Sequence, residues 1–274
     1  MSASNEPAPR PSRGIYLLPN LFTTGGLFAG FYAIIAASAG HYADACIAVF
    51  VAALLDGLDG RIARLTGTQS EFGTQYDSLA DLVSFGMAPA LVMYHWALVS
   101  LKEYGPVWGK VGWTAAFLYA ACAALRLARF NSQVSVIDKR WFIGLASPAA
   151  AGLVMSFIWV MTDFEVSGRR LEFIALGVTL VAALLMVSRF RYFSFKTLPI
   201  AERVPFIVVP LAVLVFVSLY LFQSKLLLAL TAAYALSAPV TWVLGRRRRR
   251  AETADAVAGP SSEESSPVEP KGGE

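Results

Sequence analysis

Long apolar runs, separated by short polar segments, fill most of the chain between residues 17 and 244. A helix of about 20 mainly apolar residues is long enough to cross the hydrocarbon core of a bilayer. By this measure the sequence predicts eight membrane-crossing helices, at residues 17–39, 42–65, 77–100, 111–130, 142–162, 171–189, 204–222 and 226–244. The expected fold is all-α, a polytopic membrane bundle of about eight transmembrane helices.

The composition favours lipid over water as the main solvent. Of the 274 residues, 56% are hydrophobic and 15% are charged, which leaves too little polar surface to cover a soluble protein of this size. The net charge is +4, but the cations lie in clusters between apolar runs, without the interleaved aromatic residues of a nucleic-acid groove. The composition therefore argues against nucleic acid as a partner and indicates membrane lipids with anionic head groups.

The two ends of the chain differ from this apolar middle. Residues 1–14 are rich in Pro and Ser and show no signal-peptide cleavage site, so we expect a retained N-terminal tail. Residues 246–274 begin with five arginines and continue as a Ser-, Pro-, Gly- and Glu-rich stretch. They predict a basic stop segment followed by a disordered tail. Residues 15–245 then form the transmembrane domain.

Lysine and arginine are distributed unevenly between the two sides that this topology defines. One side collects Arg10, Arg13, Arg61, Arg64, Arg126, Arg129, Lys139, Arg140, Arg189, Arg191, Lys196, Arg203 and the run 246–250. The other side has Lys102, Lys110, Arg169, Arg170 and Lys225. Because cytoplasmic loops carry the excess of positive charge, the first side and both termini are predicted to face the cytoplasm from the cytoplasmic (inner) membrane.

Four aspartates flank the short connection between the second and third predicted helices: Asp56, Asp59, Asp77 and Asp81. At about 100° per residue, the members of each pair lie on one face of their helix. The short connection makes the two helices antiparallel neighbours. The four carboxylates are therefore predicted to converge at the cytoplasmic edge of the membrane.

Such a cluster needs a cation, because each carboxylate near the bilayer costs free energy and the acids repel one another. Oxygen ligands without His or Cys favour Mg²⁺ or Mn²⁺, and two ions shared by four acids can clamp a phosphoryl group. One alternative is a set of structural salt bridges with Arg61, Arg64 and Arg126. Another is a divalent-cation transporter, although the other predicted helices offer few polar groups that would continue a path to the outer face.

The residues from Asp56 to Asp81 follow the pattern D-x2-D-G-x2-A-R-x8-G-x3-D-x3-D without departure. This pattern resembles the signature of the CDP-alcohol phosphatidyltransferases. The resemblance implies a metal-dependent exchange in which a hydroxyl attacks the diphosphate of a CDP-linked lipid and CMP leaves. It implies Asp56, Asp59 and Asp77 as metal ligands, Asp81 as both ligand and general base, and a homodimer.

Candidate contacts to the CDP moiety lie around the same connection. The family resemblance implies Gly60, Arg64 and Ser70. Gly60 and Gly73 also leave room for a phosphate to approach the backbone, and Arg64 lies on nearly the same helix face as the first aspartate of the pattern. Asn20, close to the cytosolic end of the first helix, is a further candidate, with helix capping or packing as its alternative role.

The signature does not specify the acceptor alcohol, but three other stretches are informative. Residues 13–32, 124–131 and 139–152 are similar to the bacterial phosphatidylserine synthases of the membrane-embedded type. This resemblance covers roughly residues 13–200 and implies CDP-diacylglycerol and L-serine as substrates. The alternative is a related enzyme with a glycerol-phosphate or inositol-phosphate acceptor.

A serine acceptor carries a carboxylate, which a cationic pocket recognises. Arg126 and Arg129 lie three residues apart at the cytoplasmic end of the fourth predicted helix, and Lys139 follows in the next connection. We expect these three cations to bind the acceptor. Their alternative roles are contacts to lipid phosphates and pairing with the aspartates.

Overall fold

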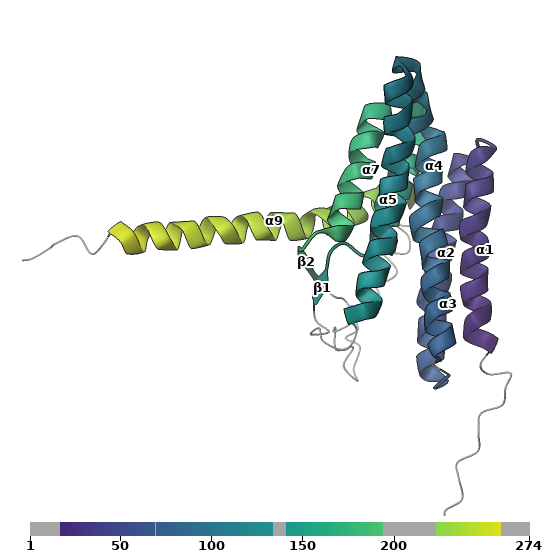
Figure 1. The fold of residues 1–274 in the computed structure, drawn as a ribbon, viewed down its shortest axis with the longest axis horizontal. Coiled ribbons are helices and arrows are strands. Elements are labelled where there is room, and N and C mark those ends of the chain that lie inside the picture. Colours follow the sequence, from purple (N-terminus) through teal and green to yellow (C-terminus); the bar gives the residue numbers. More distant parts are fainter. Residues whose placement is uncertain (1–16, 69, 134–140, 194–222, 259–274) are drawn as a thin grey trace, which may run out of the picture.

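The computed structural model describes residues 17–68, 70–133, 141–193 and 223–258 (Figure 1). The helical elements are α1 (Leu17–Ser38), α2 (Tyr42–Leu65), α3 (Glu71–Asp81), the π-helix η1 (Leu82–Met87), α4 (Ala88–Trp96), the 3₁₀ helix η2 (Leu98–Tyr104), α5 (Pro106–Gln133), α6 (Ser147–Asp163), the 3₁₀ turn η3 (Gly168–Arg170), α7 (Glu172–Val187) and α9 (Gln223–Ala258). Two three-residue strands, β1 (Trp141–Ile143) and β2 (Arg191–Phe193), form an antiparallel pair. In the described residues the fold is therefore helical apart from this small sheet.

Three described helices are long and apolar enough to cross a membrane: Leu18–Ser38 in α1, Pro106–Ser132 in α5 and Ser224–Trp242 in α9. A fourth span results if Glu71–Trp96 and η2, which meet at a bend of 43°, are counted as one. The structure thus supports a membrane protein with three or four candidate spans, and the predicted eight are not confirmed. The predicted helix 204–222 lies outside the described residues, and α6 and α7 have 17 and 16 residues, which is short for a full crossing.

The first two helices match their predicted bounds closely, but the third begins earlier than predicted. The helix that was expected at 77–100 starts at Glu71, because the Ser70 hydroxyl accepts a hydrogen bond from the Gly73 N–H (3.0 Å) and caps the first turn. The prediction was based on the length of apolar runs, and the residues of this first turn are largely polar. Asp77 therefore lies inside the helix and not at its start.

The predicted helix 142–162 was wrong at its first residues. Residues 141–143 form β1, in which Phe142 pairs with Tyr192 of β2. A short apolar run does not distinguish a buried strand from a helix by its pattern. Gly144 then turns the chain at a φ of 82°, where an added Cβ would collide with the backbone of Met186. The helix starts three residues later, at Ser147.

The last described helix is longer than expected. α9 continues through the arginine run to Ala258, so residues 251–258 are helical and not disordered as predicted. Ala and Glu in this stretch have high helix propensity, which continues a helix that has already formed. The C-terminal part of α9 extends away from α1, α2, α5 and α7, which stand side by side (Figure 1).

Small residues let α1 approach its neighbours closely. A Cβ on Gly25 would lie 3.3 Å from Leu55 of α2, and one on Gly30 would lie 2.6 Å from the Ser84 hydroxyl of η1. The Ser84 hydroxyl in turn donates a hydrogen bond to the Gly26 carbonyl (3.0 Å). These contacts fix the middle of α1 against α2, which carries Asp56 and Asp59, and against η1, which directly follows Asp81.

Candidate active site

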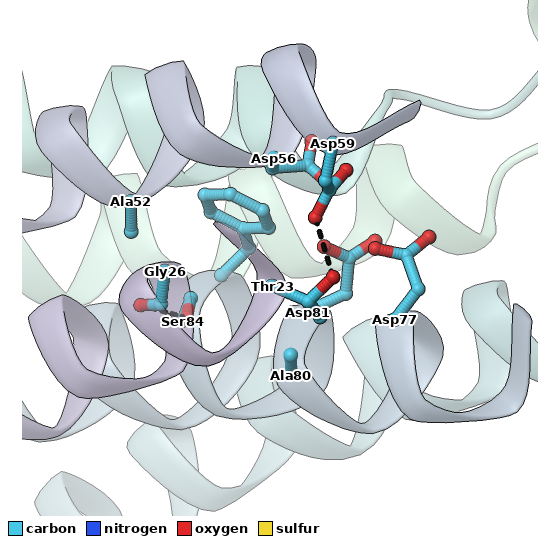
Figure 2. A pocket seen from close by; sticks show the side chains of 10 residues that line it. Thr23, Gly26, Ala52, Asp56, Asp59, Asp77, Ala80, Asp81 and Ser84 are labelled. Atoms are coloured by element: carbon cyan, nitrogen blue, oxygen red, sulfur yellow. Dashed lines mark hydrogen bonds between the residues drawn. The ribbon is translucent and has the colours of Figure 1, made fainter. Parts of the chain in front are cut away.

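The four aspartates of α2 and α3 meet at one hollow between α1, α2 and the α3–η1 helix. Its lining residues are Thr23, Gly26, Ala52, Asp56, Asp59, Asp77, Ala80, Asp81, Ser84 and Phe85. Figure 2 shows the carboxylates directed toward one another across the gap between the helices. The predicted convergence of Asp56, Asp59, Asp77 and Asp81 is thus what the structure shows.

The carboxylates are close enough to share a cation. One oxygen from each of Asp56, Asp59 and Asp77 lies within 4.8 Å of the others. The side chain of Asp81 contacts that of Asp56, and Asp59 is only 4% exposed. Acids at this separation repel one another unless a cation or protons neutralise them. The donor set, made of carboxylate oxygens, fits a hard divalent ion.

Thr23 is a site residue that the sequence-based selection missed. Its hydroxyl donates a hydrogen bond to Oδ2 of Asp59 (2.7 Å), drawn as a dashed line in Figure 2. The buried bond holds the Asp59 carboxylate in place. A signal was present in the sequence, since Thr23 is a polar residue on the apolar first helix, one turn after Pro19-Asn20.

The predicted CDP contacts lie around the ends of α2 and α3. Gly73 lies beside both Ser70 and Asn20, because an added Cβ would be 3.1 Å from the Ser70 hydroxyl and 3.6 Å from Oδ1 of Asn20. A Cβ on Gly60 would meet no heavy atom within 4 Å in the described residues. Arg64 is exposed and donates from Nε to the Gly60 carbonyl (2.8 Å). The open space at Gly60 and the guanidinium of Arg64 thus lie at the end of α2 that carries Asp56 and Asp59.

Among the predicted acceptor-binding cations, Arg126 lies within electrostatic reach of the acids. Its Nη1 donates to the Ser147 hydroxyl at the start of α6 (2.8 Å), and its electrostatic neighbours are Asp81 and Tyr234 of α9. Its Nε is buried and has no hydrogen-bond partner among the described residues. A buried N–H donor without an acceptor is costly, which makes Arg126 a candidate ligand-binding group.

The other two cations are placed less clearly. Arg129, half-buried, lies one turn further along α5, and Lys139 lies outside the described residues. The end of α5 is tied to α3 by a hydrogen bond from Nδ2 of Asn131 to the Ser78 hydroxyl (2.9 Å). This bond keeps the arginine-bearing end of α5 beside the aspartate-bearing helix.

The helical fold, the apolar spans and the carboxylate cluster define a membrane protein with an acidic site that could hold a metal ion, beside a half-buried arginine. The family model of the CDP-alcohol phosphatidyltransferases matches residues 16–190, which include all four aspartates. The chain therefore belongs to the CDP-alcohol phosphatidyltransferase family, and the resemblance seen in the sequence is confirmed.

Several curated relatives are similar to most of the chain. A CDP-diacylglycerol-serine O-phosphatidyltransferase of Helicobacter pylori is 40% identical over 186 residues, which are 68% of this chain and 76% of the relative. The protein of the same name from Mycobacterium leprae is 37% identical over 59% of this chain and 53% of its own length. An archaetidylserine synthase of Methanothermobacter thermautotrophicus is 33% identical over 64% of this chain and 69% of the relative.

Proposed function

We propose that this enzyme transfers the phosphatidyl group of CDP-diacylglycerol to the hydroxyl of L-serine, which gives phosphatidylserine and CMP. The observation that carries the proposal is the convergence of four aspartates from α2 and α3 close to the half-buried Arg126, whose Nε is buried. The names of the relatives from Helicobacter and Mycobacterium support serine as the acceptor.

The aspartates have separate roles in this proposal. Asp56, Asp59 and Asp77 hold the metal, and Asp81 is both a ligand and the general base. Two bound Mg²⁺ or Mn²⁺ ions would neutralise the diphosphate and make the serine hydroxyl more acidic. The serine oxygen forms a bond to the phosphorus that bears diacylglycerol, while the bond from that phosphorus to CMP breaks. CMP leaves with the electron pair, and the hydroxyl proton passes to Asp81.

The groups at the ends of α2 and α3 bind the CDP moiety in this proposal. Arg64 is exposed and can turn from the Gly60 carbonyl to a phosphate, where its guanidinium makes charge-assisted hydrogen bonds. The open space at Gly60 lets the nucleotide approach α2. Asn20, Ser70 and Gly73 lie together at the start of α3 and form the other side of the CDP site.

Arg126 is the best placed of the cations to bind the serine carboxylate. Ser147 occupies one of its donors, while the buried Nε–H remains available to an acceptor oxygen. Leaving such a donor unpaired costs about 1–3 kcal/mol, and a bound carboxylate removes that cost. Arg129 and Lys139 would add further positive charge for an acceptor that carries a carboxylate.

One assay tests the proposed function. Purified protein in detergent is supplied with CDP-diacylglycerol, Mg²⁺ or Mn²⁺, and one of three acceptors: L-serine, glycerol 3-phosphate or inositol phosphate. We expect CMP release with L-serine and none above background with the two phosphate-bearing alcohols. Release driven by either phosphate acceptor in place of serine would assign the enzyme to another branch of the family.

The serine contact leads to a first prediction. Arg126→Ala should raise the KM for serine about 10-fold or more, because it removes a charged hydrogen-bond donor to the carboxylate. Arg129→Ala is the matched comparison and should raise it less. The KM for CDP-diacylglycerol should change little in either variant. A normal serine KM in Arg126→Ala, or an equal rise in both KM values, would remove Arg126 from the acceptor site.

We also propose that the chain crosses the cytoplasmic membrane eight times, with the catalytic site and both termini in the cytosol. The distribution of Lys and Arg supports this topology. Residues 1–14 and 246–274 are then cytosolic segments that flank the catalytic domain at 15–245. A homodimer is proposed from the family resemblance alone.

Two exposed residues on opposite sides of the proposed membrane, Thr66 and Ser167, test this topology. In a parent protein without the buried Cys46 and Cys122, single cysteines at these positions should react differently with a membrane-impermeant maleimide in intact cells. Ser167→Cys should be labelled directly, and Thr66→Cys only after the membrane is opened. The cysteine-free parent is the control. The reverse pattern would place the aspartates on the outer side.

A further inference from the structure

A second hollow lies between α5 and α7, which stand side by side (Figure 1). It occupies the N-terminal half of α5, whereas the other end of that helix is bonded to the aspartate-bearing α3. Its volume is about 290 Å³, and an apolar cavity of about 150 Å³ is already large enough to bind benzene. Its walls are mainly apolar, with Val107, Val111 and Leu118 from α5 and Leu176 and Leu180 from α7.

The hollow has the shape of a groove that runs along the two helices. Its α5 residues recur at helical spacing, and Val107 and Leu118 are separated by about 16 Å at a rise of about 1.5 Å per residue. α5 is one of the candidate membrane spans, and half of a hydrocarbon core measures about 15 Å. The groove therefore extends through about one leaflet, as an acyl chain does.

The start of α5 carries the aromatic residues that are typical of the membrane–water interface. The rings of Tyr104 and Trp108 both pack against Phe173 of α7, each with a centroid distance of 5.3 Å. Such rings are enriched at the level of the lipid head groups. The upper end of the groove therefore lies where a phospholipid carries its phosphate.

Two polar side chains line the groove at this end. Lys110 lies in the second turn of α5, and Thr114 lies one turn deeper. Neither side chain has a hydrogen-bond or ion-pair partner within the described part of the chain. A cation at the interface, followed by a hydroxyl about 6 Å deeper, matches the order of groups in a phospholipid, where the ester carbonyls lie between the phosphate and the chains.

The acids at this end of the bundle are engaged elsewhere. Glu103 forms an ion pair with Arg169, and the buried Glu172 is hydrogen-bonded to Tyr104. The apolar segment 204–222, which lies outside the described residues, contains no acid that could pair with Lys110. The charge of Lys110 is thus complementary to an anion that the groove receives from outside the chain.

We propose that the groove between α5 and α7 binds an anionic phospholipid. One acyl chain lies between the two helices, the phosphate contacts the ammonium group of Lys110, and the Thr114 hydroxyl donates to an ester carbonyl. This lipid is separate from the lipid substrate, because the groove shares no lining residue with the hollow of the aspartates. The proposal therefore does not depend on the acceptor alcohol.

The test uses the full-length protein in phosphatidylcholine vesicles that contain a small fraction of a phosphatidylglycerol analogue with a photoreactive diazirine in one acyl chain. After illumination, mass spectrometry gives the label on residues 107–118 and 176–180 relative to that on α1, whose exposed Phe28, Phe31 and Ile35 serve as the reference for bulk lipid. We expect label on both segments in the wild type. Lys110→Gln should lower the ratio about 5-fold, as expected for one lysine beside an anionic lipid.

The matched control is Lys225→Gln, which removes a cation that is not in the groove and lies 4.8 Å from the centroid of the Phe164 ring. It should leave the ratio unchanged. A diacylglycerol analogue with the same photoreactive chain but no phosphate should label the wild type and Lys110→Gln equally. Leu180→Trp, which fills the groove, should lower the label from both analogues. All variants should elute as the wild type does in size-exclusion chromatography.

Three results would overturn the proposal. Absence of label from residues 107–118 and 176–180 in the wild type would mean that another segment or a second copy of the chain covers the groove. Equal labelling of the wild type and Lys110→Gln by the phosphatidylglycerol analogue would mean that Lys110 does not bind the phosphate. An equal fall in Lys225→Gln would reduce the effect to general surface charge.

Discussion

Replacing Asp77 by alanine is expected to lower the kcat for CMP release by at least about 10²-fold, since removal of one electrostatic stabiliser of a transition state has effects of this size. Asp77 is the member of the close triad that comes from α3, whereas the other two, Asp56 and Asp59, come from α2. Without it the close triad loses its one carboxylate from α3. The measurement is CMP release at saturating CDP-diacylglycerol and serine, over a range of Mg²⁺ and Mn²⁺ concentrations.

The control for this prediction is Glu71→Gln. Glu71 is an exposed acid on the same helix and is not among the residues that line the hollow, so its replacement should leave the rate within about 2-fold of the wild type, as for most exposed positions. Both proteins should elute as the wild type does in size-exclusion chromatography. Near-normal turnover by Asp77→Ala would show that the triad does not hold a catalytic metal.

Asp81→Asn is expected to separate binding from chemistry. If Asp81 accepts the serine proton, its loss should lower kcat by about 10²–10⁴-fold, the usual contribution of a general base. The amide oxygen of asparagine still serves as a metal ligand, so the affinity for CDP-diacylglycerol in the presence of Mg²⁺ should stay near the wild-type value. The two measurements are single-turnover CMP release and equilibrium binding of the lipid nucleotide.

The matched control is Asp44→Asn, at the opposite end of α2, where Asp44 pairs with His41 (3.4 Å). This exposed pair should not affect catalysis. An Asp81→Asn enzyme with intact kcat would require a different base. A parallel loss of lipid-nucleotide affinity and kcat would reduce Asp81 to a metal ligand.

The sequence by itself determined the class of protein and the centre of its site. Apolar runs of bilayer length predicted membrane helices, and the predicted helix 42–65 coincides with α2. Local geometry was sufficient here, because each aspartate pair lies within one helix and a short connection brings the two helices together. The spacing of the four acids was therefore sufficient to predict that their carboxylates converge, as Figure 2 shows.

Elements that depend on distant partners were not predictable in this way. The strand at 141–143 exists because residues 191–193 pair with it, and its apolar run alone is compatible with a helix. The capped start of α3 at Ser70 was missed for a related reason, since the polar residues of its first turn do not contribute to an apolar span.

The tertiary structure alone decided which side chains surround the acids. Arg126 and Arg129 are indistinguishable in the sequence, one turn apart on the same helix, and it is the packing of α6 that brings the Ser147 hydroxyl to Arg126. The Thr23 bond to Asp59 likewise requires α1 to pack closely on α2. Such contacts join residues far apart along the chain, and helical periodicity fixes which face a residue occupies but not which helix packs against that face.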